Sequence, residues 1–473
     1  MTRRSWSAAR NHRLPTHGKK GSPLASLFLF AFSNWSFAAT PEDVIQQAFT
    51  RNLHEDLTWH ALIHSSDDKP SIRGSSFLLS RDKFSPKNEL VETIRVLYAG
   101  DSGSGEKCRY PARNKWIAEK LALRPVSLQH CSELQEFIAR APADEIVLVY
   151  ASENISQPSS MMGHILLKMA GEDAQGHRRE HAVSFFTEIE GINFPKIVYD
   201  SLITGKKGYF ALSPYENRLE AYLAAEQRNV WEYRLSLTET QREMVQLHIW
   251  ELKTADPTYY FDAYNCATLT NYVLATANPD LLDAGSYLLS PLDVVKNAYR
   301  HGMFGSVSVL PSSKWKIRMI AESLPTSVNR RVKKAVDTAD ARSLPSMPSA
   351  EKQFLVESLA STYNDYLYET SRRSASDWSG YEERLRNQES PDHDRYAIEL
   401  SQYKNPLKTP KDGQWYAGFN RLEDQNYLKL GVLPISHTLS DDNSQYFSET
   451  ELRLADVSIL VSTDGGDIEL PLV

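Results

Sequence analysis

Cys266 and His164 are the side chains of this sequence best suited to form a thiol–imidazole pair. Cys266 follows Asn265, a favourable N-cap, and begins an apolar helical pattern, so the thiol is predicted in the first turn of a helix. The N–H groups and the dipole at a helix start stabilise a thiolate, which is the nucleophilic form. A nearby histidine can accept the thiol proton. His164, which opens the apolar segment HILLKMA, is our candidate for that base.

A thiol enzyme also needs a group that orients the histidine and donors for the oxyanion. His181 and Ser184 lie on the predicted hairpin partner of the His164 strand. Their side chains have opposite parity, so only one of them can face His164. Asn265, Ser160 and Tyr150 are candidates for the oxyanion donors. The alternative interpretation is a buried, inert cysteine beside a structural histidine.

The three cysteines of the sequence predict one disulfide and one free thiol. Cys108 and Cys131 share one region, and a bond between them would stabilise the fold by roughly 3 kcal/mol in the chain-entropy model. Cys266 would then stay free. Because no zinc-binding spacing occurs, we expect no metal and no cofactor.

The N-terminus predicts export. Residues 1–38 hold six basic side chains and no acid, an apolar stretch LASLFLFAF and a small-residue cleavage site, which is typical of a signal peptide. Its removal changes the formal charge from −7 to −13, which argues against nucleic acid as a partner. No later run is apolar and long enough to span a membrane. We therefore expect a periplasmic protein, whose oligomeric state the sequence does not indicate.

The order of predicted elements indicates an α+β protein. The region over 39–142 is predicted to be mostly helical, with one long amphipathic helix over 44–62 and a short strand over 75–80. The expected catalytic domain covers 143–300, with an antiparallel sheet and the Cys266 helix. A helical spacer over 301–410 and a β module over 411–473, which we expect to be incomplete or small, follow.

The sequence resembles the Lnb-type N-terminal periplasmic domain family, within the circularly permuted NlpC/papain-like enzymes that include the lecithin–retinol-acyltransferase-like group. In that branch a histidine strand precedes an Asn-Cys helix, as His164 precedes Asn265-Cys266 here. The resembling segments are CRYPARNKW (108–116), Cys131, SQPSSMMGHILLKM (156–169), RNVWEYRLSLT (228–238), IWELKTADPTYYFDAYNC (249–266) and PLDVVKNAY (291–299).

The resemblance implies a permuted papain-like core with Cys266 as nucleophile and His164 as base. The position after the hairpin, usually asparagine in the family, is Ser184 here. The implied function is a periplasmic cysteine acyltransferase or hydrolase that acts on a lipid or lipoprotein acyl group at the membrane surface, through a thioester. Family members that N-acylate lipoproteins carry transmembrane helices after this domain, which this sequence lacks. The alternatives are a cell-wall peptide amidase or endopeptidase of the same thiol class, and a non-catalytic envelope scaffold.

Overall fold

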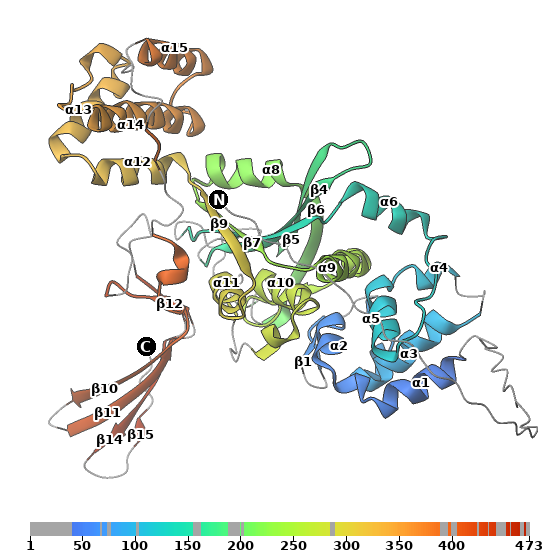
Figure 1. Ribbon diagram of the computed structural model, residues 1–473. Coiled ribbons are helices and arrows are strands. Elements are labelled where there is room, and N and C mark those ends of the chain that lie inside the picture. The colour runs from blue at the N-terminus through green and yellow to red at the C-terminus, as the bar shows by residue number, and fades with distance from the viewer. Residues whose placement is uncertain are drawn as a thin grey trace, which may run out of the picture. The chain divides into compact units, whose positions relative to one another are not determined.

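The computed structural model describes most of the chain after residue 39. The described residues are 40–66, 69–72, 77–100, 104–154, 162–187, 199, 203–283, 289–387, 396–398, 404–422, 425–433, 435–440, 451–454, 456–463 and 468–469. The predicted signal peptide, residues 1–38, lies outside them. The α+β class is confirmed (Figure 1). Among the described residues, none of the helices combines the length and the apolar character that crossing a membrane requires.

The N-terminal region is helical, as predicted, but its first helix is shorter than expected. Asn52 adopts a left-handed conformation with φ 51°, and the Asp56 side chain accepts a hydrogen bond from the Thr58 N–H. This N-cap starts a new helix and divides the expected helix over 44–62 in two. The helices here are α1 (Pro41–Thr50), α2 (Leu57–Leu62), α3 (Pro86–Tyr98), α4 (Ser104–Lys107), α5 (Pro111–Leu121) and α6 (Ser132–Arg140), beside the short strands β1 (Ser65–Ser66) and β2 (Lys69–Pro70).

The strand predicted over 75–80 is wrong for its described part, residues 77–80. The Leu79 and Ser80 N–H groups donate to the buried Glu89 carboxylate of α3, at 3.0 and 2.8 Å. Because this carboxylate satisfies the backbone donors, the segment needs no strand partner.

A seven-stranded antiparallel sheet forms the centre of the expected catalytic region. Its order is β8-β6-β5-β4-β3-β7-β9. The apolar segment that begins at Glu145 is buried in the interior of this sheet as strand β3. The bounds are β3 (Glu145–Ala151), β4 (His164–Glu172), β5 (Arg178–Thr187), β6 (Lys206–Pro214), β7 (Val230–Leu235), β8 (Thr258–Tyr259) and β9 (Phe304–Leu310).

Strand β9 was not anticipated, because residues 301–410 were expected to be a helical spacer. It pairs with β7 at the edge of the sheet, with Trp231 opposite Val309. Its sequence, FGSVSVL, alternates small polar and β-branched residues, which suits a partly exposed edge strand. The sheet therefore continues past residue 300, whereas the domain boundaries themselves stay predictions.

Helices cover both faces of this sheet. On one face Tyr215, in α8 (Tyr215–Glu220), and Tyr222 pack with Val149, Leu166 and Ala182. On the other face lie α10 and α11, which contact β3 and β4, with α9 beside α10 (Figure 1). Their bounds are α9 (Glu239–Glu251), α10 (Cys266–Ala275) and α11 (Pro291–Arg300).

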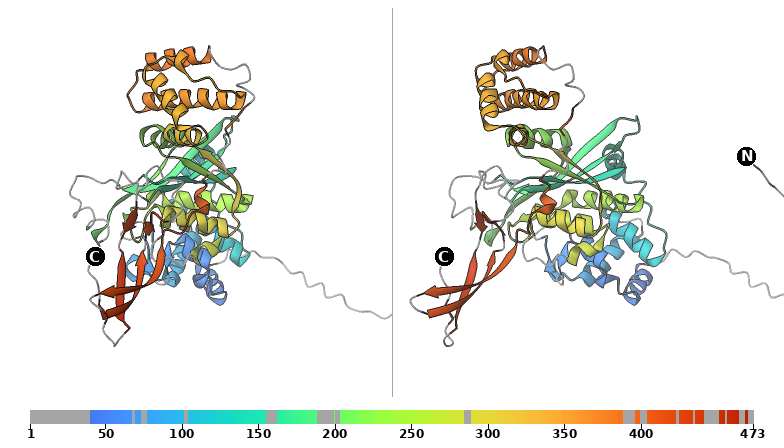
Figure 2. Two further views of the ribbon diagram at one scale, coloured as in Figure 1. Left: turned by 90° about the vertical axis from the view of Figure 1, so that its left-hand side faces the viewer. Right: turned by 60° about the vertical axis from the view of Figure 1, so that its left-hand side comes forward.

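Two further groups of elements follow in the chain. The helices α12 (Ser313–Glu322), α13 (Thr326–Asp337), α14 (Ala350–Glu369) and α15 (Ala375–Arg386) share a core that includes Val336, Leu359 and Tyr381 (Figure 2). An antiparallel sheet ordered β10-β11-β14-β15 comes last. Its strands, and a separate pair, are β10 (Gln414–Leu422), β11 (Gln425–Leu433), β14 (Val457–Ser462), β15 (Ile468–Glu469), β12 (Ile435–His437) and β13 (Leu452–Leu454).

Candidate active site

Cys266 is the first residue of α10, as predicted. The Asn265 side chain accepts hydrogen bonds from the Ala267 and Thr268 N–H groups at 2.9 and 3.0 Å, which caps the helix. The thiol is free and buried, and the residue is 4% exposed. The sequence pattern therefore predicted the position of this cysteine correctly.

Four donors face the Cys266 sulfur. The Tyr259 hydroxyl donates to Sγ at 4.0 Å, and the backbone N–H groups of Ile165, Ala267 and Cys266 also interact with it. Burial raises the pKa of the Cys266 thiol, and these donors oppose the rise because they stabilise the thiolate. The resting thiol is therefore protonated.

The contact with Ile165 brings Cys266 to the start of β4, beside His164. In the register of β3 and β4, Tyr150 lies opposite Ile165 and Ala151 opposite His164. The paired register of β4 with β5 begins only at Leu167. The first residues of β4 thus contact α10 before the pairing of β4 with β5 begins. His164 directly precedes Ile165, whose N–H faces the sulfur.

His164 is partly buried and uncharged. Its ring lies 6.3 Å from the Tyr222 ring, measured between centroids. Burial and the positive charges of Arg228 and Arg218 lower the pKa of His164 to about 3. Tyr222 also interacts electrostatically with Cys266, and its own pKa is raised to about 12, chiefly by burial. His164 and Cys266 therefore share Tyr222 as a neighbour, and the imidazole is uncharged and, with its lowered pKa, a weak base.

Gly163 permits this approach of β4. It has φ +80°, a conformation that favours glycine. A Cβ at this position would lie 2.7 Å from the Tyr150 ring and 3.0 Å from the Ala151 carbonyl oxygen. The Tyr150 ring therefore occupies the space that a side chain before His164 would need.

The sheet register separates the two candidates for the group that orients His164. His181 lies opposite Met169, five residues along β4 from His164, so the structure does not bring these two histidines together. Ser184 lies nearer to the start of β4, because its neighbour Val183 is opposite Leu167, the first residue of β4 that pairs with β5. Its side chain is 2% exposed, and its hydroxyl has no hydrogen-bond partner among the described residues.

The site thus combines a buried thiol at a capped helix start with a strand that begins with a histidine. Residues 133–301 match the Lnb N-terminal periplasmic domain. The matched segment contains Cys266, His164 and Ser184. The match is to a periplasmic domain, so the predicted periplasmic location is confirmed.

A second family covers part of the N-terminal region. Residues 51–120 match a domain of unknown function, DUF7843. No curated protein and no solved structure matches the chain.

The predicted oxyanion donors differ in their surroundings. The Asn265 amide donates to the Phe261 and Leu289 carbonyls at 2.9 and 3.3 Å, so its donors serve the loop around the helix start. Tyr150 donates to Glu153. Ser160 lies outside the described residues. Among the donors to the sulfur, Tyr259 and the Ile165 N–H were not predicted from the sequence.

The signals for the missed residues were weak. Tyr259 belongs to the aromatic run YYFDAY before Asn265, where each ring also suits a core. The Ile165 contribution comes from its backbone, which no residue type reveals. Arg228 and Tyr222 lie in separate segments that only the folded sheet brings to His164.

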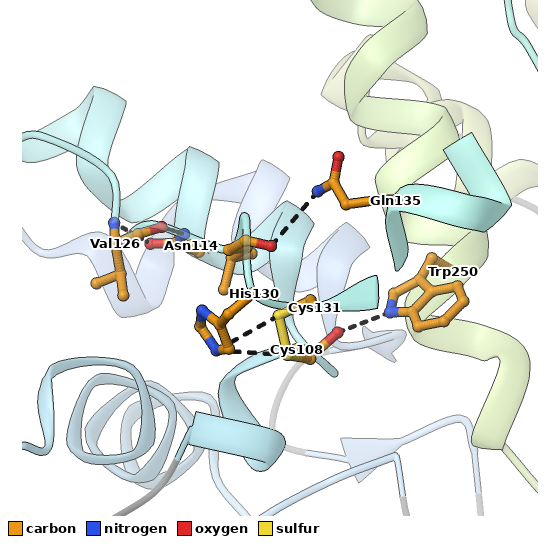
Figure 3. Close-up of a disulfide and its surroundings, with 8 residues drawn as sticks. Cys108, Asn114, Val126, His130, Cys131, Gln135 and Trp250 are labelled. Atoms are coloured by element: carbon orange, nitrogen blue, oxygen red, sulfur yellow. Dashed lines mark hydrogen bonds between the residues drawn. A yellow bond between two sulfur atoms is a disulfide. The ribbon is translucent and has the colours of Figure 1, made fainter. Parts of the chain in front are cut away.

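The predicted disulfide is confirmed. Cys108 and Cys131 are bonded, with their Cα atoms 5.6 Å apart (Figure 3). The exposed His130 ring lies beside it, with Nε2 3.8 Å from the Cys108 sulfur and 3.7 Å from the Cys131 sulfur. The three residues form a group of potential metal ligands. Because the S–S bond occupies both sulfurs, neither is a thiolate ligand here.

Proposed function

We propose that Cys266 is the nucleophile of a periplasmic acyltransferase or hydrolase that acts on an ester or amide of an envelope substrate. The observation that carries the proposal is the free thiol at the start of α10, with hydrogen-bond donors at its sulfur. Tyr222 is a neighbour that this thiol shares with the ring of His164. Donors at the sulfur stabilise the thiolate from which an attack on a carbonyl starts.

The proposed reaction begins from a neutral thiol and a neutral imidazole. As Cys266 Sγ bonds to the substrate carbonyl carbon, His164 accepts the thiol proton. The tetrahedral intermediate then collapses, the bond to the leaving alcohol or amine breaks, and the leaving group takes the proton from His164. The thioester that remains is resolved by an amine, in a transferase, or by water, in a hydrolase.

The proposed substrate class comes from the resemblance to permuted papain-like acyltransferases, which favours a lipid or lipoprotein acyl group as the donor. The match to a periplasmic domain supports an envelope substrate. Membership of the permuted thiol class is part of the same proposal. Ser184 is the proposed orienting group, because it is buried and its hydroxyl has no hydrogen-bond partner among the described residues.

An acyl-adduct experiment tests the proposal. Purified protein is incubated with envelope lipids or with an acyl-thioester probe, and the mass of each cysteine peptide is measured. We expect an acyl group on Cys266 in the wild type, and none in Cys266→Ala or, at short times, in His164→Ala. Labelling that persists in Cys266→Ala at another residue would contradict the proposal.

Two alternatives give different outcomes in the same experiment. A cell-wall peptide amidase would release products from muropeptides and ignore the lipid donor. A scaffold protein would form no adduct with either substrate while folded, and the burial of the Cys266 thiol is the observation that favours it. A Cys266 adduct that forms only after unfolding would support the scaffold.

A further inference from the structure

A continuous chain of buried polar side chains joins the N-terminal helices to the segment that carries Cys266. The His64 Nδ1 atom lies 2.6 Å from the Tyr264 hydroxyl, and its Nε2 atom lies 2.9 Å from Nε2 of His248. His64 and His248 are fully buried, and Tyr264 is 1% exposed. Tyr264 is two residues from Cys266, whereas His64 follows α2, far away in the sequence.

The chain continues beyond His248 to charged groups. His248 Nδ1 lies 3.5 Å from Glu251 Oε2, and Arg113 Nε lies 3.4 Å from the same oxygen. Arg113 Nη1 forms a 2.8 Å ion pair with Glu89, and the side chains of all four residues are fully buried. Breaking one member of such a buried group leaves its neighbours uncompensated, so the whole chain is coupled to the fold.

Hydrogen bonds link Tyr264, His64 and His248. Burial lowers the pKa of His64 and of His248, so both rings are neutral. Of the two Nε2 atoms that face each other, one therefore carries a hydrogen and the other accepts it. With the hydrogen on His64 Nε2, His64 Nδ1 accepts from the Tyr264 hydroxyl; with the hydrogen on His248 Nε2, His64 Nδ1 donates to it. In both arrangements the His64 imidazole holds the Tyr264 hydroxyl.

The backbone at His64 shows that the imidazole is held there against a conformational cost. His64 has φ 47°, in the left-handed region that disfavours most residues. Its ring stacks on Tyr272 of α10, with centroids 4.8 Å apart and an interplanar angle of 16°. A strained backbone of this kind persists only where the surrounding contacts hold it in place. His64 thus contacts α10 directly, as well as the residue before its N-cap.

We propose that the chain from Glu251 through His248 and His64 to Tyr264 positions the Cys266 segment, and that His64 and Tyr264 are positioning residues for this thiol. Phe185 transmits the constraint, because its ring lies 5.6 Å from the Tyr264 ring and 5.1 Å from the ring of Tyr259, the donor to the sulfur. The N-terminal region matched to DUF7843 is then a working part of the thiol site. A catalytic role for this positioning rests on the proposed function. The positioning of the Cys266 segment by the chain does not depend on it.

Two conservative variants test the inference. Tyr264→Phe removes one hydroxyl and keeps the ring. His64→Asn removes the bridging imidazole and keeps a residue that tolerates the left-handed backbone. The readout is the rate at which iodoacetamide alkylates Cys266, measured by mass between pH 7 and pH 10. We expect the midpoint of alkylation to rise by about one pH unit in each variant, which slows the reaction at neutral pH roughly tenfold, because the displaced thiolate loses a donor.

The matched control is Asn271→Ala. Asn271 is a buried residue of α10 whose amide donates to the Leu281 carbonyl at 3.1 Å, so its loss destabilises the same helix without touching the chain. We expect this control to keep the wild-type midpoint of Cys266 alkylation. Hydrogen exchange over residues 257–265 should become faster only in Tyr264→Phe and His64→Asn. A wild-type midpoint and wild-type exchange in Tyr264→Phe, or the same midpoint change in Asn271→Ala, would overturn the inference. Because alkylation needs no substrate, a failure of the proposed acyl chemistry would leave this result readable.

Discussion

Burial sets the charge state of the two residues at the candidate site. It raises the pKa of Cys266 and lowers the pKa of His164 to about 3, so thiol and imidazole are both neutral at rest. A preformed thiolate–imidazolium pair would need the opposite changes. Proton transfer from the thiol to His164 would therefore have to overcome both changes, because burial disfavours the charged thiolate and the charged imidazolium alike.

This charge state predicts the pH dependence of Cys266 alkylation in the wild type. Because the pKa of the thiol lies above its ordinary value, the rate is expected to keep rising past pH 9, without a step near pH 6.5, where an ordinary histidine titrates. The measurement is the alkylation rate of Cys266 by mass from pH 5 to pH 10, with the urea-unfolded protein as the control. A plateau already reached at pH 7 would contradict the neutral pair.

At the residue scale, the sequence predicted those features that depend on nearby residues. Three cysteines identified Cys266 as the free one, and Asn265 marked the helix start. The choice between His181 and Ser184 stayed open because it depends on the register of β4 and β5. Tyr222 and Arg228 could not be found at all, because only the folded sheet brings them to His164.

At the scale of elements, the turn into β4 determines where His164 lies. Gly163 and Gly176 both have positive φ, at +80° and +77°, but their surroundings differ. A Cβ at Gly163 would meet Tyr150 and the Ala151 carbonyl, whereas a Cβ at Gly176 would meet nothing within 4 Å. Alanine at Gly176 would therefore introduce backbone strain alone, whereas alanine at Gly163 would add a steric clash.

Alanine at these glycines should have unequal effects. We expect Gly176→Ala to cost about 1 kcal/mol of unfolding free energy, from backbone strain alone. Gly163→Ala should cost roughly 1–3 kcal/mol more and should slow the acylation of Cys266, because His164 must move. Urea unfolding of both variants measures the difference. Equal midpoints would show that Tyr150 yields freely and that the turn does not hold His164.

The elements themselves were predictable where their ends carry a signal. The start of α10 carries such a signal in Asn265, whose side chain accepts from the Ala267 and Thr268 N–H groups. Strand β9 was missed because its alternation is short and contains small residues that also suit a loop. The strand expected at residues 77–80 failed because a distant carboxylate, Glu89, takes the backbone donors that a neighbouring strand would have taken.

At the scale of the whole molecule, two neutral histidines in the core make the fold sensitive to acid. Burial lowers the pKa of His64 and His248 in the folded state, whereas both take up protons near pH 6.5 once unfolded. The unfolded state therefore binds more protons below that pH, and the free energy of unfolding falls as the pH decreases. Near Arg113, an added positive charge on either ring would also be repelled.

We therefore expect the urea midpoint to decrease between pH 7 and pH 5. The double variant His64→Asn/His248→Asn should start from a lower stability and lose less of it over this range. His177→Asn is the control, because the His177 side chain is 69% exposed and its replacement should leave the slope unchanged. The same slope in the double variant and in the wild type would assign the acid sensitivity to other groups.

No sequence pattern predicted the contact between His64 and His248. The two residues lie in different regions, and a histidine in an apolar helix gives no signal of its partner. The family matches assign these residues to two separate segments, 51–120 and 133–301. Each segment holds part of one set of hydrogen bonds, so a recombination event that brought in either segment from a divergent protein would place mismatched polar groups in the interior. The two segments should therefore be inherited together, and a change at His64 or Arg113 should be accompanied in evolution by compensating changes at Tyr264, His248 or Glu251.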